Sequence, residues 1–133
     1  MTFLCDTNVI SELVRPQPNP GVITWSTQIS SIYLSVVTVE EIYYGLASKP
    51  NSRITKGINQ LIEGYCTILP ITPEIAKRSG ELRGYLRTQG KPRTQADMLI
   101  AATAQLSQLT VVTRNVRDFD DCDLQILNPF TLV

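Results

Sequence analysis

Four acidic residues, spread over most of the chain, could together bind a divalent cation. They are Asp6, Glu41, Asp97 and Asp118. Carboxylate oxygens are the ligands that hard cations such as Mg²⁺ and Mn²⁺ prefer in proteins. The sequence contains no histidine, which excludes histidine-dependent catalysis and imidazole ligands. Any metal site in this chain would therefore be built from oxygen ligands.

Two of these acids also fit a purely structural interpretation. Asp6 stands between an apolar segment and a predicted helix, where Asp is a preferred N-cap, so both cap and ligand remain open. Glu41 stands in Thr38-Val39-Glu40-Glu41, and Thr-x-x-Glu is the pattern of a capping box. Glu40 is the alternative to Glu41. Because neighbouring helical residues lie about 100° apart around the axis, the two side chains cannot aim at one point.

The other two acids have different surroundings. Asp97 follows Thr94 at capping-box spacing, but it also precedes the apolar residues of 98–104 and lies on the inward side of that predicted helix. An unpaired carboxylate beside packed apolar side chains is costly, so a functional role is favoured. Asp118 lies in the segment 113–119, where Asn and Asp are also common turn formers.

Short apolar segments alternate with segments of helical periodicity along the whole sequence. Strands are predicted at 2–5, 32–37, 67–71, 109–113 and 124–127. Helices are predicted at 8–14, 21–30, 38–48, 52–65, 73–88 and 94–108. This alternation predicts an α/β fold, in which a central parallel sheet of about five strands is covered by helices on both faces. A length of 133 residues indicates a single domain over 1–133.

This fold would bring the four acids to one edge of the sheet. Asp6 and Asp118 follow predicted strands, and Glu41 and Asp97 lie in the first turns of predicted helices. In open α/β sheets such positions meet beyond the carboxyl ends of the strands. Like charges held so close raise one another's pKa, and a divalent cation would relieve the repulsion.

Composition and charge limit the class of protein. With 43% hydrophobic and 18% charged residues the chain is typical of a globular protein. We expect a cytoplasmic protein without membrane contact, because the apolar stretches are too short to span a bilayer and no signal peptide is visible. The cysteines Cys5, Cys66 and Cys122 are odd in number and lack zinc-site spacing, so free thiols are expected. The net charge is zero, but the stretch 77–93 is basic.

The four acids lie in four sequence motifs. These motifs resemble those of the PIN-domain endoribonucleases, in particular the VapC-type toxins of bacterial toxin–antitoxin operons. The motifs span 4–10, 35–45, 96–104 and 112–119, and Asn128-Pro129-Phe130 resembles the ending of the family. The second motif selects Glu41 over Glu40. In the fourth, the last acid of the family stands either where Asn115 or where Asp118 stands, and only Asp118 is acidic here.

The resemblance implies a single PIN-like domain and a Mg²⁺-dependent endoribonuclease, with Mn²⁺ as a possible substitute. Asp6 and Asp97 would hold the metal ion, directly or through water, and Glu41 and Asp118 would complete the catalytic set. The supporting polar residues would be Asn8, Thr113 and Asn115. The phosphates of RNA would be bound by Arg78, Arg83, Arg87 and Arg114. The implied partners are the RNA substrate, a small cognate antitoxin and a second copy of the chain in a homodimer.

Two other functions remain as alternatives. A catalytically inactive PIN-like module would bind RNA or a partner without cleaving it. A receiver-like phospho-acceptor domain also uses acids at strand ends, but it would want paired acids near the first strand and a lysine after the last one. Position 5 is Cys and 124–129 contains no lysine, so this alternative ranks below. A phosphatase with Asp-x-Asp after the first strand is excluded because residue 8 is Asn.

Overall fold

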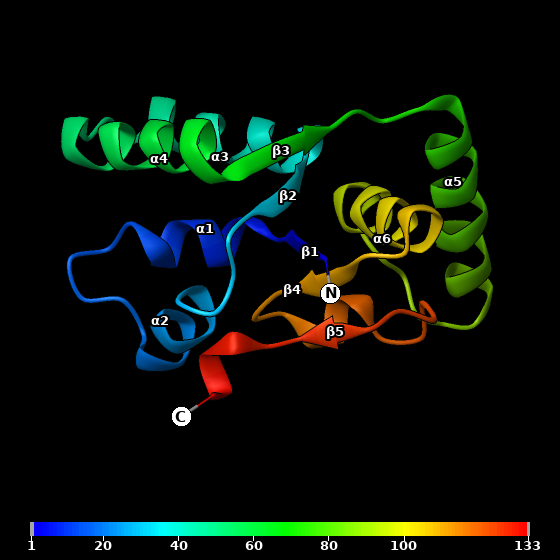
Figure 1. Cartoon of the computed structure of the whole chain (residues 1–133). Coiled ribbons are helices and arrows are strands. Elements are labelled where there is room, and N and C mark those ends of the chain that lie inside the picture. The colour runs from blue at the N-terminus through cyan, green and yellow to red at the C-terminus, as the bar shows by residue number, and fades with distance from the viewer. Residues whose placement is uncertain (1, 133) are drawn as a thin grey trace.

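The computed structural model describes residues 2–132, which form one central sheet flanked by helices (Figure 1). The sheet has five strands in the order β3-β2-β1-β4-β5, and every neighbouring pair is parallel. The strands are β1 (Phe3–Cys5), β2 (Ile32–Ser35), β3 (Cys66–Leu69), β4 (Thr110–Val112) and β5 (Ile126–Leu127). The predicted parallel sheet is therefore confirmed.

Six α-helices and two 3₁₀ helices connect these strands within residues 2–132. The α-helices are α1 (Thr7–Leu13), α2 (Pro20–Ser26), α3 (Val36–Ser48), α4 (Ser52–Tyr65), α5 (Pro73–Thr88) and α6 (Gln95–Ser107). The 3₁₀ helices are η1 (Val116–Phe119) and η2 (Pro129–Thr131). In Figure 1, α3 and α4 lie together on one side of the molecule and α5 and α6 lie together on the other. The 3₁₀ helix η2 lies against α2.

Side chains of the central strands alternate between two apolar cores, as the two-residue period of a strand requires. Leu4 and Val111, which are paired in register, point into a core formed with α5, α6 and η1. Cys5 and Val112 are the next pair, and they point into a second core formed with helices α1 to α4. All four side chains are fully buried. The sheet is thus covered on both faces, as the sequence predicted.

The order of the strands creates a switch point between β1 and β4. From β1 the chain adds β2 and then β3 on one side, and it later crosses to add β4 and β5 on the other. The connections on the two sides of β1 therefore leave in opposite directions and open a crevice beyond the strand ends, which is where α/β sheets bind ligands. Asp6 and Thr113 follow the two strands that flank this crevice.

Among the predicted boundaries that differ from the structure, two have identifiable local reasons. The strand predicted at 32–37 ends at Ser35, because the Ser35 side chain accepts a hydrogen bond from the Val37 N–H and caps a helix that starts at Val36. The helix predicted at 21–30 ends at Ser26. There the hydroxyls of Ser26 and Thr27 bond to main-chain carbonyls, and such bonds compete with continuation of a helix.

The helix predicted at 73–88 has the predicted bounds. Thr72 caps its first turn with its side chain. At the other end Gly90 has a φ of 74°, and the N–H groups of Gly90 and Lys91 bond to the carbonyls of Arg87 and Leu86. This pair of bonds is a Schellman motif, which needs the left-handed conformation that glycine adopts without strain. It directs the chain from α5 back along α6.

The thiols are free, as predicted. Cys5 and Cys122 are buried and Cys66 is half-buried, and this burial raises the pKa of each thiol. Among residues 2–132, none of the helices combines the length and the hydropathy needed to span a bilayer.

The central position of Leu4 in the sheet can be tested by substitution. Leu4→Ala should lower the free energy of unfolding by about 2–5 kcal/mol, because it leaves a cavity in a fully buried site. Ile23→Ala is the control, since Ile23 on α2 is 42% exposed and its truncation should change stability by only about 0.5 kcal/mol. Urea unfolding measures both values. Equal losses would contradict the placement of Leu4 in the core.

Candidate functional site

Asp6 lies at the carboxyl end of β1 and is held by three hydrogen bonds. Its Oδ1 accepts from the Thr7 N–H at 2.8 Å. Its Oδ2 accepts from the Thr113 hydroxyl at 2.8 Å and from Asn8 Nδ2 at 3.3 Å. Asp6 is only 6% exposed, and a buried carboxylate needs such donors to stay in place. The cap interpretation is thus correct, and the same side chain borders the crevice between β1 and β4.

The supporting polar residues join the ends of β1 and β4. Besides donating to Asp6, the Thr113 hydroxyl accepts from the Asn115 N–H at 3.0 Å. Asn8 Oδ1 accepts from the Arg114 N–H at 3.0 Å. Thr113 is fully buried, whereas the Asn115 side chain is exposed and only its main chain enters the network. Asn8 and Thr113 therefore fix the orientation of Asp6.

Glu41 reaches the site from α3, through a contact that the sequence did not reveal. The Thr7 hydroxyl donates to Glu41 Oε1 at 2.9 Å, while the Thr7 N–H holds Asp6. The predicted capping box at Thr38 is wrong, because α3 begins at Val36 and Thr38 is fully buried within the helix. Glu40 is exposed. Thr7 could not be recognised as a link because its partner lies 34 residues away along the chain.

Asp97 lies in the first turn of α6, where the Thr94 hydroxyl accepts from its N–H at 3.1 Å. The pKa of Asp97 is raised from 3.8 to about 6, and desolvation is the largest cause. The negative charges of Asp6, Asp118 and Glu41 also contribute to this rise, while a hydrogen bond from Thr94 acts in the opposite direction. Asp97 is therefore close enough to each of the other three acids named from the sequence for their charges to act on it.

Asp118 lies in η1. Arg93, just before α6, is hydrogen-bonded to that segment. Arg93 Nη1 donates to the carbonyl oxygens of Asp118 at 3.1 Å and Asp120 at 2.8 Å. Lys91 Nζ forms an ion pair with Asp121 at 3.0 Å. Two cations of the basic stretch 77–93, Lys91 and Arg93, therefore bind groups of the protein itself. Because Arg93 directly precedes the cap of α6, it connects the segments that carry Asp97 and Asp118.

The arginines predicted to bind RNA lie in two places. Arg78, Arg83 and Arg87 are exposed on α5. Arg114 follows β4 directly beside Thr113, and its guanidinium lies over the Phe130 ring, 4.6 Å from the centroid. Arg114 is thus joined to the acid site through the Asn8 network, while the three arginines of α5 lie on a helix that carries none of the four acids.

The four acids offer a donor set that suits a hard divalent cation. All donors are carboxylate oxygens, and within residues 2–132 none of the four forms an ion pair with a basic side chain. In the same residues, no three Asp, Glu or Cys side chains are arranged so that they could hold an ion by themselves. Mg²⁺ is nevertheless commonly held by one or two carboxylates together with water and substrate phosphates. Asp6 and Asp97 fit that mode of binding.

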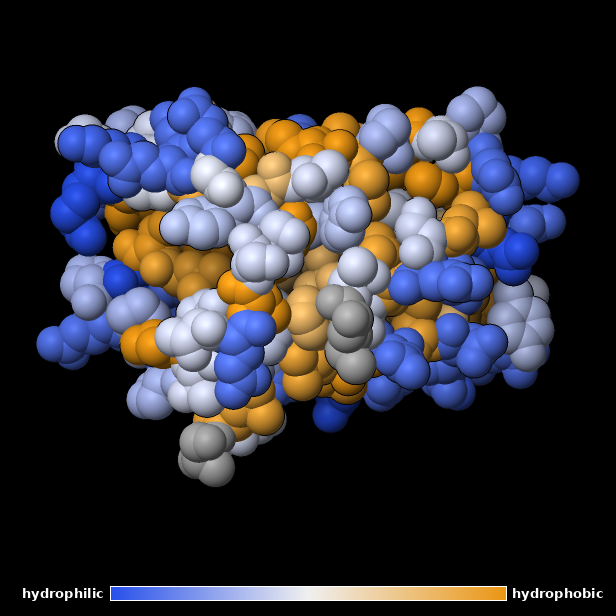
Figure 2. Space-filling model, in the orientation of Figure 1, coloured by the Kyte–Doolittle hydropathy of each residue, from blue (hydrophilic) through white to orange (hydrophobic). Residues whose placement is uncertain are grey.

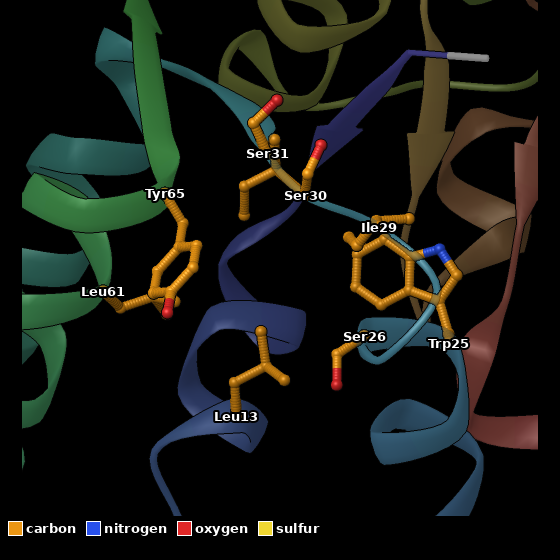
Figure 3. A pocket seen from close by; sticks show the side chains of 9 residues that line it. Leu13, Trp25, Ser26, Ile29, Ser30, Ser31, Leu61 and Tyr65 are labelled. Atoms are coloured by element: carbon orange, nitrogen blue, oxygen red, sulfur yellow. The ribbon is translucent and has the colours of Figure 1, made fainter.

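A separate apolar cavity lies at the other end of the sheet. It has a volume of about 390 Å³ and shares no residue with the four acids. Leu13, Trp25, Ile29 and Leu61 surround it, with Ser30 and Tyr65 at its margin (Figure 3). Figure 2 shows apolar surface in the hollow between α4 and the side formed by α1 and α2. The cavity lacks the charged groups that the chemistry of the acids would require.

Substitution of Arg93 should loosen η1. Arg93→Met removes a partly buried donor from two carbonyls and should lower the free energy of unfolding by about 1–3 kcal/mol. Lys91→Met is the matched control: its ion pair is half exposed and should contribute at most about 1 kcal/mol. Urea unfolding and amide hydrogen exchange of residues 116–120 measure the two effects. Unchanged exchange in Arg93→Met would show that the guanidinium does not hold this segment.

The raised pKa of Asp97 predicts a dependence of stability on pH. Since the folded pKa of about 6 exceeds the ordinary value of 3.8, the folded state binds this proton more tightly. Its stabilising contribution is full below pH 3.8 and is lost as the pH rises through about 6. In EDTA above that pH, Asp97→Asn should therefore be more stable than the wild type, and the difference should shrink at lower pH. Urea unfolding across this range is the measurement, with exposed Asp123→Asn as control; a less stable Asp97→Asn at every pH would contradict it.

Known proteins show the same fold and a related sequence. The PIN domain family matches residues 3–123. Toxin FitB of Neisseria gonorrhoeae (strain ATCC 700825 / FA 1090) is 39% identical over 138 aligned residues, which cover 96% of this chain and 98% of FitB. VapC ribonuclease Y4jK of Sinorhizobium fredii (strain NBRC 101917 / NGR234) is 34% identical, covering 96% of this chain and 97% of that protein. The crystal structure of FitAcB from Neisseria gonorrhoeae has a TM-score of 0.86 and 36% identity, covering 98% of this chain and 100% of that chain. The chain therefore belongs to the PIN-domain family, as the resemblance of its motifs predicted.

Proposed function

We propose that this protein is a Mg²⁺-dependent endoribonuclease and the toxin of a toxin–antitoxin pair. The observation that carries the proposal is the electrostatic crowding of Asp6, Glu41, Asp97 and Asp118 at the switch point of the sheet. Relatives named as a toxin and as a ribonuclease, which match nearly the whole chain, support it. Dependence on a divalent cation is general among PIN-domain nucleases of the VapC type, and Mg²⁺ is the specific ion proposed here, with Mn²⁺ as a substitute.

Different residues of the chain would have different roles in the hydrolysis of an RNA phosphodiester bond. Asp6 and Asp97 would hold the cation, which would supply positive charge beside the phosphoryl oxygens and acidify a water molecule. Glu41, held by the Thr7 hydroxyl, or Asp118 in η1 would orient that water and accept its proton. Thr113 and Asn8 would keep Asp6 in position through the hydrogen bonds described above. No step requires a histidine.

The RNA would be bound by cations that neutralise its backbone phosphates. Arg114 is the first candidate, because its main chain is bonded to Asn8 within the site. The exposed Arg78, Arg83 and Arg87 would extend this surface along α5. The partners proposed by family resemblance are a small antitoxin that blocks the acid site and a second copy of the chain. Sedimentation of the purified protein tests the homodimer.

One alternative follows from the fold alone. A PIN-domain protein with an inactive site would bind RNA or a partner and would not cleave. The receiver-like alternative is set aside, since the chain belongs to a different family. The cleavage assay below separates the first alternative from the proposed nuclease.

Asp6→Asn and Asp97→Asn should each lower Mg²⁺-dependent RNA cleavage by more than about 100-fold. Loss of a residue that only supports a metal ligand lowers activity by up to about 100-fold, and loss of the ligand itself should cost more. Both variants should stay folded by circular dichroism. Asp123→Asn is the control, because Asp123 lies on an exposed turn with a φ of 54° that Asn tolerates. Cleavage of total cellular RNA, with Mg²⁺ titrated and with EDTA, is the measurement. Cleavage retained in either site variant would remove that residue from the proposed mechanism, and a wild type that never cleaves would favour the inactive module.

A further inference from the structure

We propose that the cleft between α1, α3 and α4 is the subsite for the nucleotide next to the RNA phosphate that is cut; this rests on the ribonuclease function proposed above. The cleft has a volume of about 490 Å³. Thr7 and Glu41 form part of its wall, and the same two residues share the hydrogen bond that reaches the acid site. A ligand in the cleft therefore lies directly beside the acids.

The interior of the cleft suits a nucleobase. Its floor is apolar and is formed by residues from α3 and α4, among them Ile42, Leu46 and Ile58. A nucleobase has apolar faces, and single-stranded RNA is recognised with its bases turned out of the stack and packed against protein side chains. The Ser11 hydroxyl on α1 borders the same space and offers a donor and an acceptor to the edge of a base or to a ribose hydroxyl.

Basic side chains also line the cleft. Glu41 and Lys49 lie eight residues apart on and just after α3, which corresponds to about 12 Å along the helix axis. Arg15, two residues beyond the end of α1, also lines the cleft. Its Nη1 is held by Glu12 Oε1 at 3.2 Å, and the remaining guanidinium donors stay available because its side chain is 64% exposed.

The cleft thus combines acids, an apolar floor and cations, and this arrangement matches one nucleotide of an RNA strand. The phosphate to be cut would lie at the acids with the divalent cation, the base would pack on the apolar floor, and the next phosphate would meet Arg15 and Lys49. A purely apolar ligand would use neither Lys49 nor the guanidinium donors of Arg15 that Glu12 leaves available. The cleft would therefore select which nucleotide adjoins the cut, in addition to holding the strand.

Gly45 provides a way to fill the cleft without disturbing the fold. It borders the cleft on α3, and a Cβ added there meets no heavy atom within 4 Å. Gly64 on α4 is a matched control: it also lies in a helix and has open space at its Cβ, but it does not line the cleft. Replacing either glycine by leucine improves helix propensity, so both variants should fold.

The first experiment compares Gly45→Leu with Gly64→Leu. Binding of mixed-sequence single-stranded RNA oligonucleotides is measured by fluorescence anisotropy in the Asp97→Asn background. Cleavage sites in the same pool are mapped by sequencing with an intact acid site. Gly45→Leu should weaken binding by at least about tenfold, the scale for steric exclusion from a pocket, and should change the base preferred beside the cut. Gly64→Leu should match the parent protein in both measurements.

The second experiment tests the cations. Arg15→Gln combined with Lys49→Gln should reduce the salt dependence of RNA binding, lowering the slope of log K against log salt by about 1.4, or about 0.7 for each phosphate contact on a single strand. Arg53→Gln combined with Lys56→Gln removes the same charge from the exposed surface of α4 and should leave the slope unchanged.

The outcomes separate this proposal from the function on which it rests. If the wild type cleaves RNA but Gly45→Leu binds and cuts with the wild-type affinity and base preference, the nucleotide subsite is overturned while the nuclease function stands. Equal changes in slope for the two charge pairs would also overturn it. If the wild type does not cleave RNA in Mg²⁺, the proposed function itself fails.

Discussion

The repulsion between carboxylates gathered at one crevice is the constraint on which the rest of the structure depends. Asp6, Glu41 and Asp118 lie close enough to Asp97 for their charges to contribute to its raised pKa. Such an arrangement is unfavourable for the free protein, so the surrounding fold must hold the acids in place. Three sets of contacts each hold one part of the crevice. They are the hydrogen bonds around Asp6, the hydrogen bond from Thr7 to Glu41, and the hydrogen bonds from Arg93 to η1. A bound divalent cation would relieve the repulsion between the carboxylates, and this relief would strengthen its binding.

The two apolar cores provide the rigidity that this arrangement needs. One core fixes β1 and β4 against α5, α6 and η1, and with them the segments that carry Asp97 and Asp118. The other fixes the same strands against α1 and α3, which carry the residues around Asp6 and Glu41. The site therefore lies where both layers meet the edge of the sheet. Glu41, Asp97 and Asp118 stand on helices, and Asp6 stands directly between β1 and α1; regular elements position side chains more precisely than loops do.

Most of the fold could be predicted because its signals are local. Apolar segments alternating with helical periodicity indicated the parallel sheet, and the helix predicted at 73–88 has the bounds of α5. The errors were local as well. Val36 and Val37 favour a strand by propensity, but the Ser35 side chain caps a helix there. The helix after Pro20 is shorter than its apolar period indicated, because hydroxyls near its end bond to the main chain.

The sequence by itself determined the types of the site residues: four carboxylates, no histidine and polar support at Asn8 and Thr113. Only the tertiary structure decided how they are connected, because those contacts join residues that are distant in the chain. Thr7 meets Glu41 across 34 positions, and Arg93 meets the carbonyl of Asp118 across 25. No periodicity or capping pattern encodes such a pair. The structure also decided that Lys91 and Arg93 bind the protein, and that Arg15 and Lys49 line one cleft with Glu41. Residue types follow from composition, whereas their contacts follow from the packing of helices and strands.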